Sequence, residues 1–177
     1  MISDFVKGAQ KNSYDWDVRQ GILLHRAIDT YTDSHALVAE AKTFFRPKYR
    51  LYSGAVVDVL FDHFVANDVN CFSTKDALIK FSQATYQTLE AHLPILPVRF
   101  GQMLPYMRDQ NWLLDYRSHA GVERSLVRMV RRAAYLDDSH TAYTLLMEHY
   151  DALRSLYSAF FPELQASAQQ KFRELTS

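Results

Sequence analysis

The sequence predicts an all-α protein, a helical bundle in a single domain that spans residues 1–177. Apolar residues recur at three- and four-residue spacing along most of the chain, and no segment shows the period-two alternation that is typical of strands. Glycine and proline number only five each, too few for a β fold rich in turns. With 48% hydrophobic residues, a chain of 177 residues can bury a sizeable core.

Composition and charge argue against several classes of protein. Lysine plus arginine equals aspartate plus glutamate, at 20 each, so net charge gives no support for generic nucleic-acid binding. The single Cys71 excludes an internal disulfide and a multi-cysteine zinc site, and it suits a reducing cytoplasm. No apolar run approaches 18 residues, and the first residues lack the pattern of a signal peptide. We therefore expect a cytoplasmic protein with neither a membrane nor a nucleic acid as its partner.

Capping residues, glycine and proline divide the first half of the chain into helices. The predicted elements are a helix end at 2–7, a polar linker at 9–14, a helix from 15–17 to 32–34, a short helix at 35–45, and a long helix at about 49–66. Gly8 stops the first of these, and Asp15 or Asp17 starts the second helix. Ser34 is the predicted cap of the short helix, and Pro47 is predicted to break it.

Similar signals predict the helices of the second half. They are expected from 73–76 to about 92, at 98–108, at 111–117, from about 120 to 134, from 138–139 through 161, and on to about 174. Ser73 and Asp76 resemble a capping box, with aspartate in place of glutamate. Pro94 and Pro97 end the helix that this box opens, and Pro162 divides the last helical stretch.

Two polar ladders interrupt otherwise apolar helices. His25, Asp29 and Asp33 follow one another at four-residue spacing, and so do Asp58 and Asp62, so each set lies on one helix face. Acids and histidines among apolar neighbours are costly to bury unless they are paired or bind a metal. We expect the two helices to pack against each other so that both ladders face a common space.

The residue types of the ladders fit a metal site. Imidazole and carboxylate suit manganese, iron or zinc, and carboxylate-rich sites favour the harder manganese and magnesium ions. Asp58, Asp62 and the adjacent His63 are the stronger candidates, because nearly all of their neighbours are apolar. Spacing alone leaves open a solvated face on which Arg26 pairs with Asp29, or a structural partner for each acid of the second ladder.

A group of arginines marks the C-terminal half of the chain. Its members are Arg108, Arg117, Arg124, Arg128, Arg131 and Arg132. A solvated face is the more common explanation of such a group, and a docking surface for an acidic partner or a phosphate is the alternative. The helical spacing of Arg124, Arg128 and Arg131 places them on neighbouring faces, which favours docking.

Three stretches resemble the acyl carrier protein phosphodiesterase family. They are Asp4-Phe-Val-Lys-Gly8, Gly21-Ile-x-x-His25-Arg-x-Ile-Asp29-x-x-Thr-Asp33 and Asp58-Val-x-x-Asp62-His63-Phe. Further matching positions are Asn111-Trp112-Leu, Tyr116-Arg117 and His149-Tyr150-Asp151-Ala-Leu153. The resemblance covers essentially the whole chain, and its His-Arg-x-Ile-Asp and Asp-His-Phe signatures are together quite specific.

The resemblance implies a divergent, all-helical relative of the HD-domain metal phosphohydrolases. It implies hydrolysis of holo-acyl carrier protein at the phosphodiester between 4′-phosphopantetheine and a carrier serine, with Mn²⁺ as the metal and Fe²⁺ or Mg²⁺ as alternatives. The hydrolase hypothesis that builds on the resemblance takes Asp4, His25, Asp29, Asp62 and His63 as the ligands of one or two metal ions. Asp58 would be a ligand or orient one, and Arg26 would neutralise charge on the phosphate. The acidic carrier protein would dock on Arg117, Arg124, Arg128 and Arg131.

The chain departs from the family pattern at one point and from the wider HD superfamily at another. Family members begin about twenty residues earlier, so we expect a shortened N-terminus that leaves one side of the metal pocket open and weakens activity. The order Asp62-His63 reverses the His-Asp doublet of HD proteins, so that doublet does not assign individual ligands.

Two other functions stay open at this point. One is a non-catalytic module that binds an acidic partner, and the other is an HD-like phosphohydrolase that acts on a nucleotide or another phosphoester. Stoichiometric metal in the purified protein would favour the enzymes over the binding module, and residues at the pocket mouth would separate the two substrates.

Overall fold

The computed structural model describes residues 2–133 and 138–177, and α-helices and short 3-10 helices form nearly all of this part of the chain. The elements are η1 (Ser3–Phe5), η2 (Gly8–Ser13), α1 (Trp16–Ser34), α2 (Ala36–Thr43), α3 (Arg46–Tyr49), η3 (Arg50–Tyr52), α4 (Ser53–Asn67), α5 (Lys75–Ala91), η4 (Leu93–Ile95), α6 (Val98–Asp109), α7 (Trp112–Asp115), α8 (His119–Arg132), α9 (His140–Glu148) and α10 (Tyr150–Thr176). The described residues include no strand, so the all-α prediction is confirmed.

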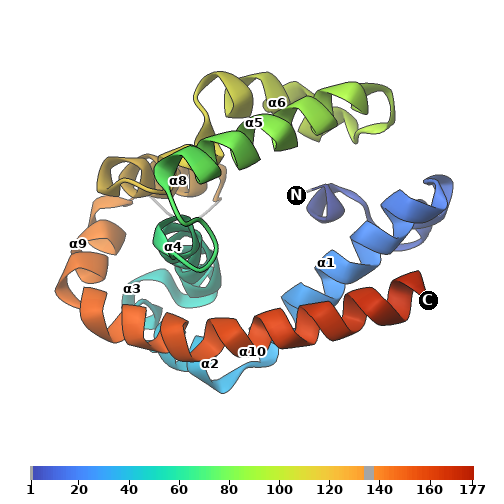
Figure 1. Ribbon diagram of the computed structural model, residues 1–177. Helices are drawn as coiled ribbons and strands as arrows, with labels where there is room; N and C mark the ends of the chain where they lie inside the picture. Colours follow the sequence, from blue (N-terminus) through green and yellow to red (C-terminus); the bar gives the residue numbers. More distant parts are fainter. Residues whose placement is uncertain (1, 134–137) are drawn as a thin grey trace.

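The helices enclose α4 from several sides (Figure 1). α1 and α10 lie side by side along one edge of the molecule, and α2 packs against both. α5 and α6 form a separate layer that faces α1, and η1 sits between that layer and α1. Phe5 of η1 makes an edge-to-face contact with Phe100 of α6, with ring centroids 5.5 Å apart, which fixes η1 against this layer.

The predicted direct packing of α1 against α4 is wrong. α1 packs mainly on α10 and α2, whereas α4 packs on α2, α8 and α10, so α2 and α10 connect the two ladder-bearing helices. The reason is the difference in their apolar surface. Nine residues of α4 are buried, which needs cover from several helices, whereas Ile22 is the one buried residue of α1.

The apolar residues form two clusters. The larger is built from α2, α4, α8, α9 and α10, and Leu60, Leu126 and Phe160 lie at its centre. The smaller joins α5 and α6 around Phe100 and includes partly buried residues of η1 and α7. α4 and α8 therefore belong to the larger cluster, and η1 is anchored in the smaller one.

Several predicted helix boundaries in the first half differ from the structure. η1 and η2 are 3-10 helices where a helix end and a polar linker were expected, and the chain turns between them at Gly8, whose φ is +50°. His35, rather than Ser34, caps α2, because its Nδ1 accepts a hydrogen bond from the backbone N–H of Leu37. Pro47 lies in the first turn of α3, where a backbone N–H would have no hydrogen-bond partner within the helix, so proline is tolerated there.

Helix boundaries in the second half of the chain also differ from those predicted. Thr74, rather than Ser73, caps α5, with its Oγ1 accepting from the N–H of Ala77. The break in the last helical stretch falls at His149, between α9 and α10, while Pro162 lies inside α10 and does not divide it. The predicted end of α8 at residue 134 lies outside the described residues. Among the described helices, none is long and apolar enough to cross a membrane.

Candidate metal centre

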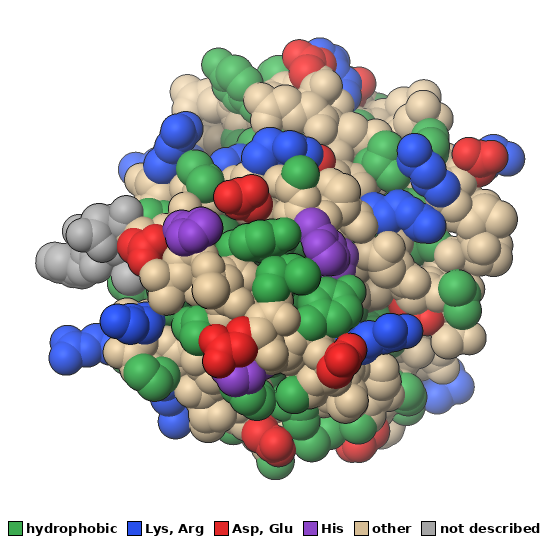
Figure 2. All heavy atoms as spheres, turned by 90° about the vertical axis from the view of Figure 1, so that its left-hand side faces the viewer, with side chains coloured by type: hydrophobic (Ala, Val, Ile, Leu, Met, Phe, Trp, Pro, Cys, Tyr) green, Lys and Arg blue, Asp and Glu red, His purple; other side chains and the backbone are tan. Residues whose placement is uncertain are grey.

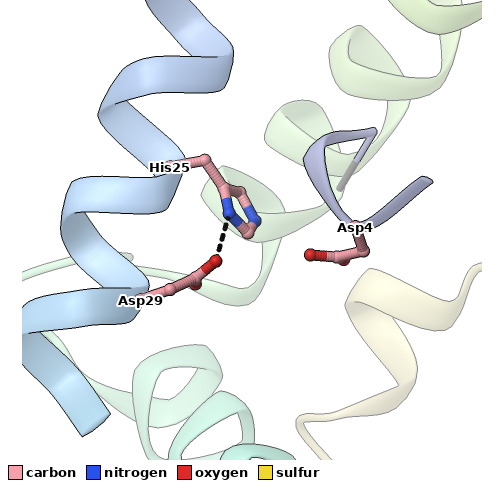
Figure 3. A group of neighbouring side chains, drawn as sticks. All are labelled: Asp4, His25 and Asp29. Atoms are coloured by element: carbon pink, nitrogen blue, oxygen red, sulfur yellow. Dashed lines mark hydrogen bonds and ion pairs between the residues drawn. The ribbon is translucent and has the colours of Figure 1, made fainter. Parts of the chain in front are cut away.

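Three side chains from two separate segments converge at the surface, where Asp4 and Asp29 are exposed and His25 is half-buried. Asp4 lies on η1, while His25 and Asp29 lie one turn apart on α1, and each offers a donor atom within 4.8 Å of the other two (Figure 3). The Nδ1 of His25 lies 2.9 Å from a carboxylate oxygen of Asp29. This group of an imidazole and two carboxylates is a metal-ligating set by its chemistry.

The N-terminal segment is held in place by Arg26. Its Nη2 donates a hydrogen bond of 2.6 Å to the carbonyl oxygen of Val6, which lies two residues after Asp4. Arg26 is next to His25 in the chain and points to a different side of α1. The same helix therefore carries two members of the group and anchors the segment that carries the third.

Asp58 and Asp62 form a second acidic pair, one turn apart on α4. Both side chains are exposed to water, yet burial is the largest cause of their raised pKa values, about 6 for Asp58 and about 7 for Asp62. Each carboxyl group therefore touches water while protein surrounds much of it. We call the space in front of these two residues the α4 recess.

The electrostatic neighbours of Asp58 show that the two acidic groups share a region. Burial is the largest cause of the raised pKa of Asp58, and the negative charge of Asp33 is the second. The charge of Lys42 lowers this pKa, and those of Asp29 and Asp4 raise it further. Charges act strongly only over short distances in water, so the α4 recess borders the group on η1 and α1. The two ladders thus face a common region even though their helices do not pack directly.

Asp33, the last member of the first ladder, pairs with a lysine outside the group of Asp4, His25 and Asp29. Lys42 of α2 donates a hydrogen bond of 2.9 Å to its carboxylate. This pair ties the end of α1 to α2. It also leaves His25 and Asp29 as the part of the ladder that meets Asp4.

The structure does not bring His63 to the acidic group. Its ring is buried, with Nδ1 2.7 Å from the carbonyl oxygen of Tyr116 and Nε2 2.9 Å from the hydroxyl of Tyr150. Burial lowers its pKa, which favours the neutral ring. Consecutive residues on a helix point about 100° apart, so Asp62 faces the recess while His63 faces the core.

A tyrosine supports Asp62 from the other side. Tyr116 follows α7, and a hydrogen bond from its side chain to Asp62 lowers the pKa of that carboxyl against the effect of burial. Ser125 of α8 is a further hydrogen-bond partner of the Tyr116 hydroxyl. Sequence reasoning placed Tyr116 among the matching family positions but assigned it no role, because the contact joins segments more than fifty residues apart.

The four arginines predicted to bind a partner are divided by the structure. Arg124, Arg128 and Arg131 of α8 line one groove, whereas Arg117 lies between α7 and α8 and does not line it. The carboxylate of Asp115 pairs with Arg124 and lies 3.8 Å from Arg128. The basic surface is therefore centred on α8.

Comparison with known proteins adds an independent line of evidence. A family model described as acyl carrier protein phosphodiesterase matches residues 1–164. A protein of this name from Enterobacter sp. (strain 638) is 34% identical over 171 residues, which cover 97% of this chain and 89% of the relative. Relatives of the same name from Yersinia pestis and Photorhabdus laumondii are 32% and 29% identical over the same length, covering 89% and 86% of those proteins. No solved structure gives a significant match.

Proposed function

This chain belongs to the acyl carrier protein phosphodiesterase family, and from that membership we propose that it hydrolyses holo-acyl carrier protein with a metal ion held by Asp4, His25 and Asp29. A water oxygen attacks the phosphorus, and the bond between the phosphorus and the serine oxygen of the carrier breaks. The serine oxygen leaves with a proton as apo-carrier protein, and 4′-phosphopantetheine is the other product.

The observation that carries this proposal is the convergence of donors from η1 and α1. Two carboxylates and an imidazole from separate segments offer donor atoms within 4.8 Å of one another, close enough for one cation to bind all three. The family resemblance favours Mn²⁺, with Fe²⁺ or Mg²⁺ as alternatives, and two carboxylates with one imidazole are compatible with all three ions. When bound, such an ion supplies a water of lowered pKa and polarises a phosphoryl oxygen.

The α4 recess supplies the acid–base chemistry in this proposal. A pKa of about 6 lets Asp58 accept a proton from the attacking water near neutral pH and release it afterwards. Asp62, one turn away on α4, would be a further ligand to the metal in this proposal, and the Tyr116 side chain holds its carboxylate in place. His63 takes a supporting role, because it fixes the backbone of Tyr116 through Nδ1.

Arg26 acts in this proposal through position rather than through contact with the phosphate. Its hydrogen bond to Val6 keeps Asp4 opposite His25. We therefore treat residues 1–177 as one functional domain, because the ends of the chain contribute together: η1 carries Asp4, and α10 supports α1. We place the protein in the cytoplasm, where carrier proteins of fatty acid biosynthesis act and where Cys71 stays reduced.

The test is an incubation of the purified protein with holo-acyl carrier protein and Mn²⁺, with the carrier followed by mass spectrometry. We expect loss of the phosphopantetheine arm in the presence of Mn²⁺ and none after the metal is removed with a chelator. The Asp29→Asn variant should bind less metal and release less of the arm.

The controls separate this proposal from the other functions. An Asp76→Asn variant, at an exposed position in the first turn of α5, should behave like the unchanged protein. Binding of holo-carrier protein without release of the arm, at full metal content, would replace the enzyme with a binding module. Hydrolysis of nucleotides in preference to holo-carrier protein would change the substrate.

A further inference from the structure

A groove runs along α8 on the side that faces α6. It encloses about 670 Å³ and is lined by Met103, Tyr106 and Gln110 of α6 and the following turn, by Trp112 of α7, and by Ala120, Glu123, Arg124, Val127, Arg128, Arg131 and Arg132 of α8. The α8 residues recur every three or four positions, so they form one stripe along the helix. From Ala120 to Arg132 this stripe is about 18 Å long at 1.5 Å per residue.

The walls of the groove combine apolar surface with positive charge. Tyr106 is 64% exposed, although it is a large aromatic side chain. The guanidinium of Arg128 lies 4.3 Å from the ring centroid of Trp112, which orients it across the floor by a cation–π contact. An exposed aromatic beside ordered arginines is typical of a protein-binding surface rather than of a solvated helix face.

The arginines of the groove are not equivalent. Asp115 accepts hydrogen bonds from Arg124 and lies near Arg128, so the charge of these two is partly neutralised. Arg131 and Arg132 are exposed, and neither forms an ion pair with the described residues. Among the described residues of the groove, the arginines without an acidic partner therefore lie at the C-terminal end of α8.

A short chain of contacts joins the groove to the α4 recess. Arg128 donates a hydrogen bond of 2.8 Å to the Oγ of Ser125, and Ser125 is a hydrogen-bond partner of the Tyr116 hydroxyl. Tyr116 in turn holds Asp62. A partner seated in the groove would thus lie a few side chains away from the proposed site of hydrolysis.

We propose that this groove is the docking site of the carrier protein substrate, and that it receives an amphipathic helical segment whose carboxylates meet Arg131 and Arg132 while an apolar side chain packs between Tyr106 and Val127. The inference rests on the proposed function for the identity of the partner. Its own support is the length of the groove, its apolar walls and the sign of its free charges.

The distribution of charge favours an acidic protein over a polyanion. Glu123 lines the groove among the arginines, and a nucleic acid that follows α8 would meet this carboxylate. The face that carries α9 mixes acidic, basic and histidine side chains around apolar ones (Figure 2). An acidic helix needs only local positive charge and apolar contact, and the groove offers both.

The experiment measures binding apart from chemistry. Apo-acyl carrier protein lacks the prosthetic arm, so its dissociation constant, measured by calorimetry, reports docking alone. We expect Arg131→Glu and Tyr106→Ser each to weaken this binding about tenfold, and Arg131→Lys to retain most of it. Higher salt should weaken binding to the unchanged protein and should have less effect on Arg131→Glu.

Two controls keep the outcomes distinct. Arg173→Glu changes an exposed arginine of α10 outside the groove, and it should leave the dissociation constant unchanged. Melting temperatures identify any groove variant that has lost its fold, in which case Arg131→Gln takes its place. With holo-carrier protein, the groove variants should raise KM far more than they lower kcat.

Each result has one meaning. If the unchanged protein releases phosphopantetheine but the groove variants bind apo-carrier protein as tightly as it does, the docking inference is overturned and the proposed function stands. If the unchanged protein binds the carrier protein through the groove and releases nothing, the docking inference stands and the proposed function fails. Tighter binding of single-stranded DNA than of carrier protein in the groove would also overturn the inference.

Discussion

At the scale of single residues, Asp58 and Asp62 are acids whose charged form is disfavoured by the surrounding protein. Their pKa values, about 6 and about 7, lie above the ordinary value for aspartate because the surrounding protein weakens their solvation. The folded protein therefore binds more protons than the unfolded chain between about pH 4 and pH 7. Because proton binding favours the folded state here, the stability of the metal-free protein should fall as the pH rises through this range and the two residues lose their protons.

The first prediction follows from that sign. Asp62→Asn removes one of the two charges, so the metal-free variant should melt about 2 to 4 °C higher at pH 7.5, a gain of roughly 1 kcal/mol that is limited because the side chain touches water. At pH 4.5 the gain should vanish. Thermal melts at both pH values check this, with Asp76→Asn as the control, and an equal gain at the two pH values would contradict the titration argument.

At the scale of elements, the short segment η1 depends on its neighbours for its conformation. A single 3-10 turn is not stable alone in water, and η1 is held by the contact of Phe5 with α6 and by the hydrogen bond from Arg26 to Val6. The position of Asp4 is therefore decided by α1 and α6. A change on α1 that does not touch the donor atoms should still disturb the metal centre.

The second prediction tests this dependence. Arg26→Ala removes a charge-assisted hydrogen bond worth about 2 kcal/mol to the segment, and it should speed hydrogen exchange at the N–H groups of Phe5 and Val6 and weaken Mn²⁺ binding about tenfold. Arg46→Ala, at an exposed arginine of α3, is the control. Unchanged exchange at both amides with weaker Mn²⁺ binding would point to a direct role for Arg26 instead.

The contact between α7 and α8 depends on one glycine. Gly121 is buried in α8, and a Cβ there would overlap the carbonyl oxygen of Asp115, at the end of α7. This close approach places Tyr116, the next residue, against α4. The absence of a side chain at Gly121 is thus part of what positions Asp62.

The third prediction compares two glycines in helices. Gly121→Ala should destabilise the protein by about 3 kcal/mol, because backbone atoms of Asp115 must move. Gly21→Ala, at an exposed position of α1 with open space around it, should stabilise the protein by about 0.5 to 1 kcal/mol through helix propensity. Urea denaturation measures both. A neutral effect at Gly121 would show that the end of α7 shifts without cost.

At the scale of the whole molecule, the proposed metal would join separate parts of the structure. Asp4 belongs to a segment anchored in the smaller apolar cluster, while His25 and Asp29 lie on a helix supported by α10 and α2. The unfolded chain has no such arrangement of donors. Metal binding should therefore stabilise the folded molecule as a whole.

The fourth prediction gives this effect a size. Free Mn²⁺ at about 100 times its dissociation constant should add about 2.7 kcal/mol of stability, which corresponds to a rise of roughly 5 to 11 °C in Tm for a protein of this size. Asp29→Asn should largely abolish the rise. An equal rise in the unchanged protein and in this variant would place the bound ion elsewhere on the molecule.

What the sequence by itself determined are the features that depend on neighbours along the chain. Helix periodicity predicted an all-α fold and most of the helix positions, and four-residue spacing placed His25 with Asp29 and Asp58 with Asp62 on common faces. The motifs around these residues also indicated the family. Local caps were less certain, because neighbouring residues such as Ser34 and His35 compete for the same position, and only their side-chain geometry decides between them.

Only the tertiary structure decided which distant segments meet. It put Asp4 beside α1 through Arg26, separated α1 from α4 by α2 and α10, turned His63 into the core towards Tyr150, and joined α6 and α8 into a groove. The physical reason is that such contacts depend on how apolar faces share a limited volume. Side-chain spacing along the chain predicts which residues share a helix face. The packing of all helices together decides which of these faces come into contact.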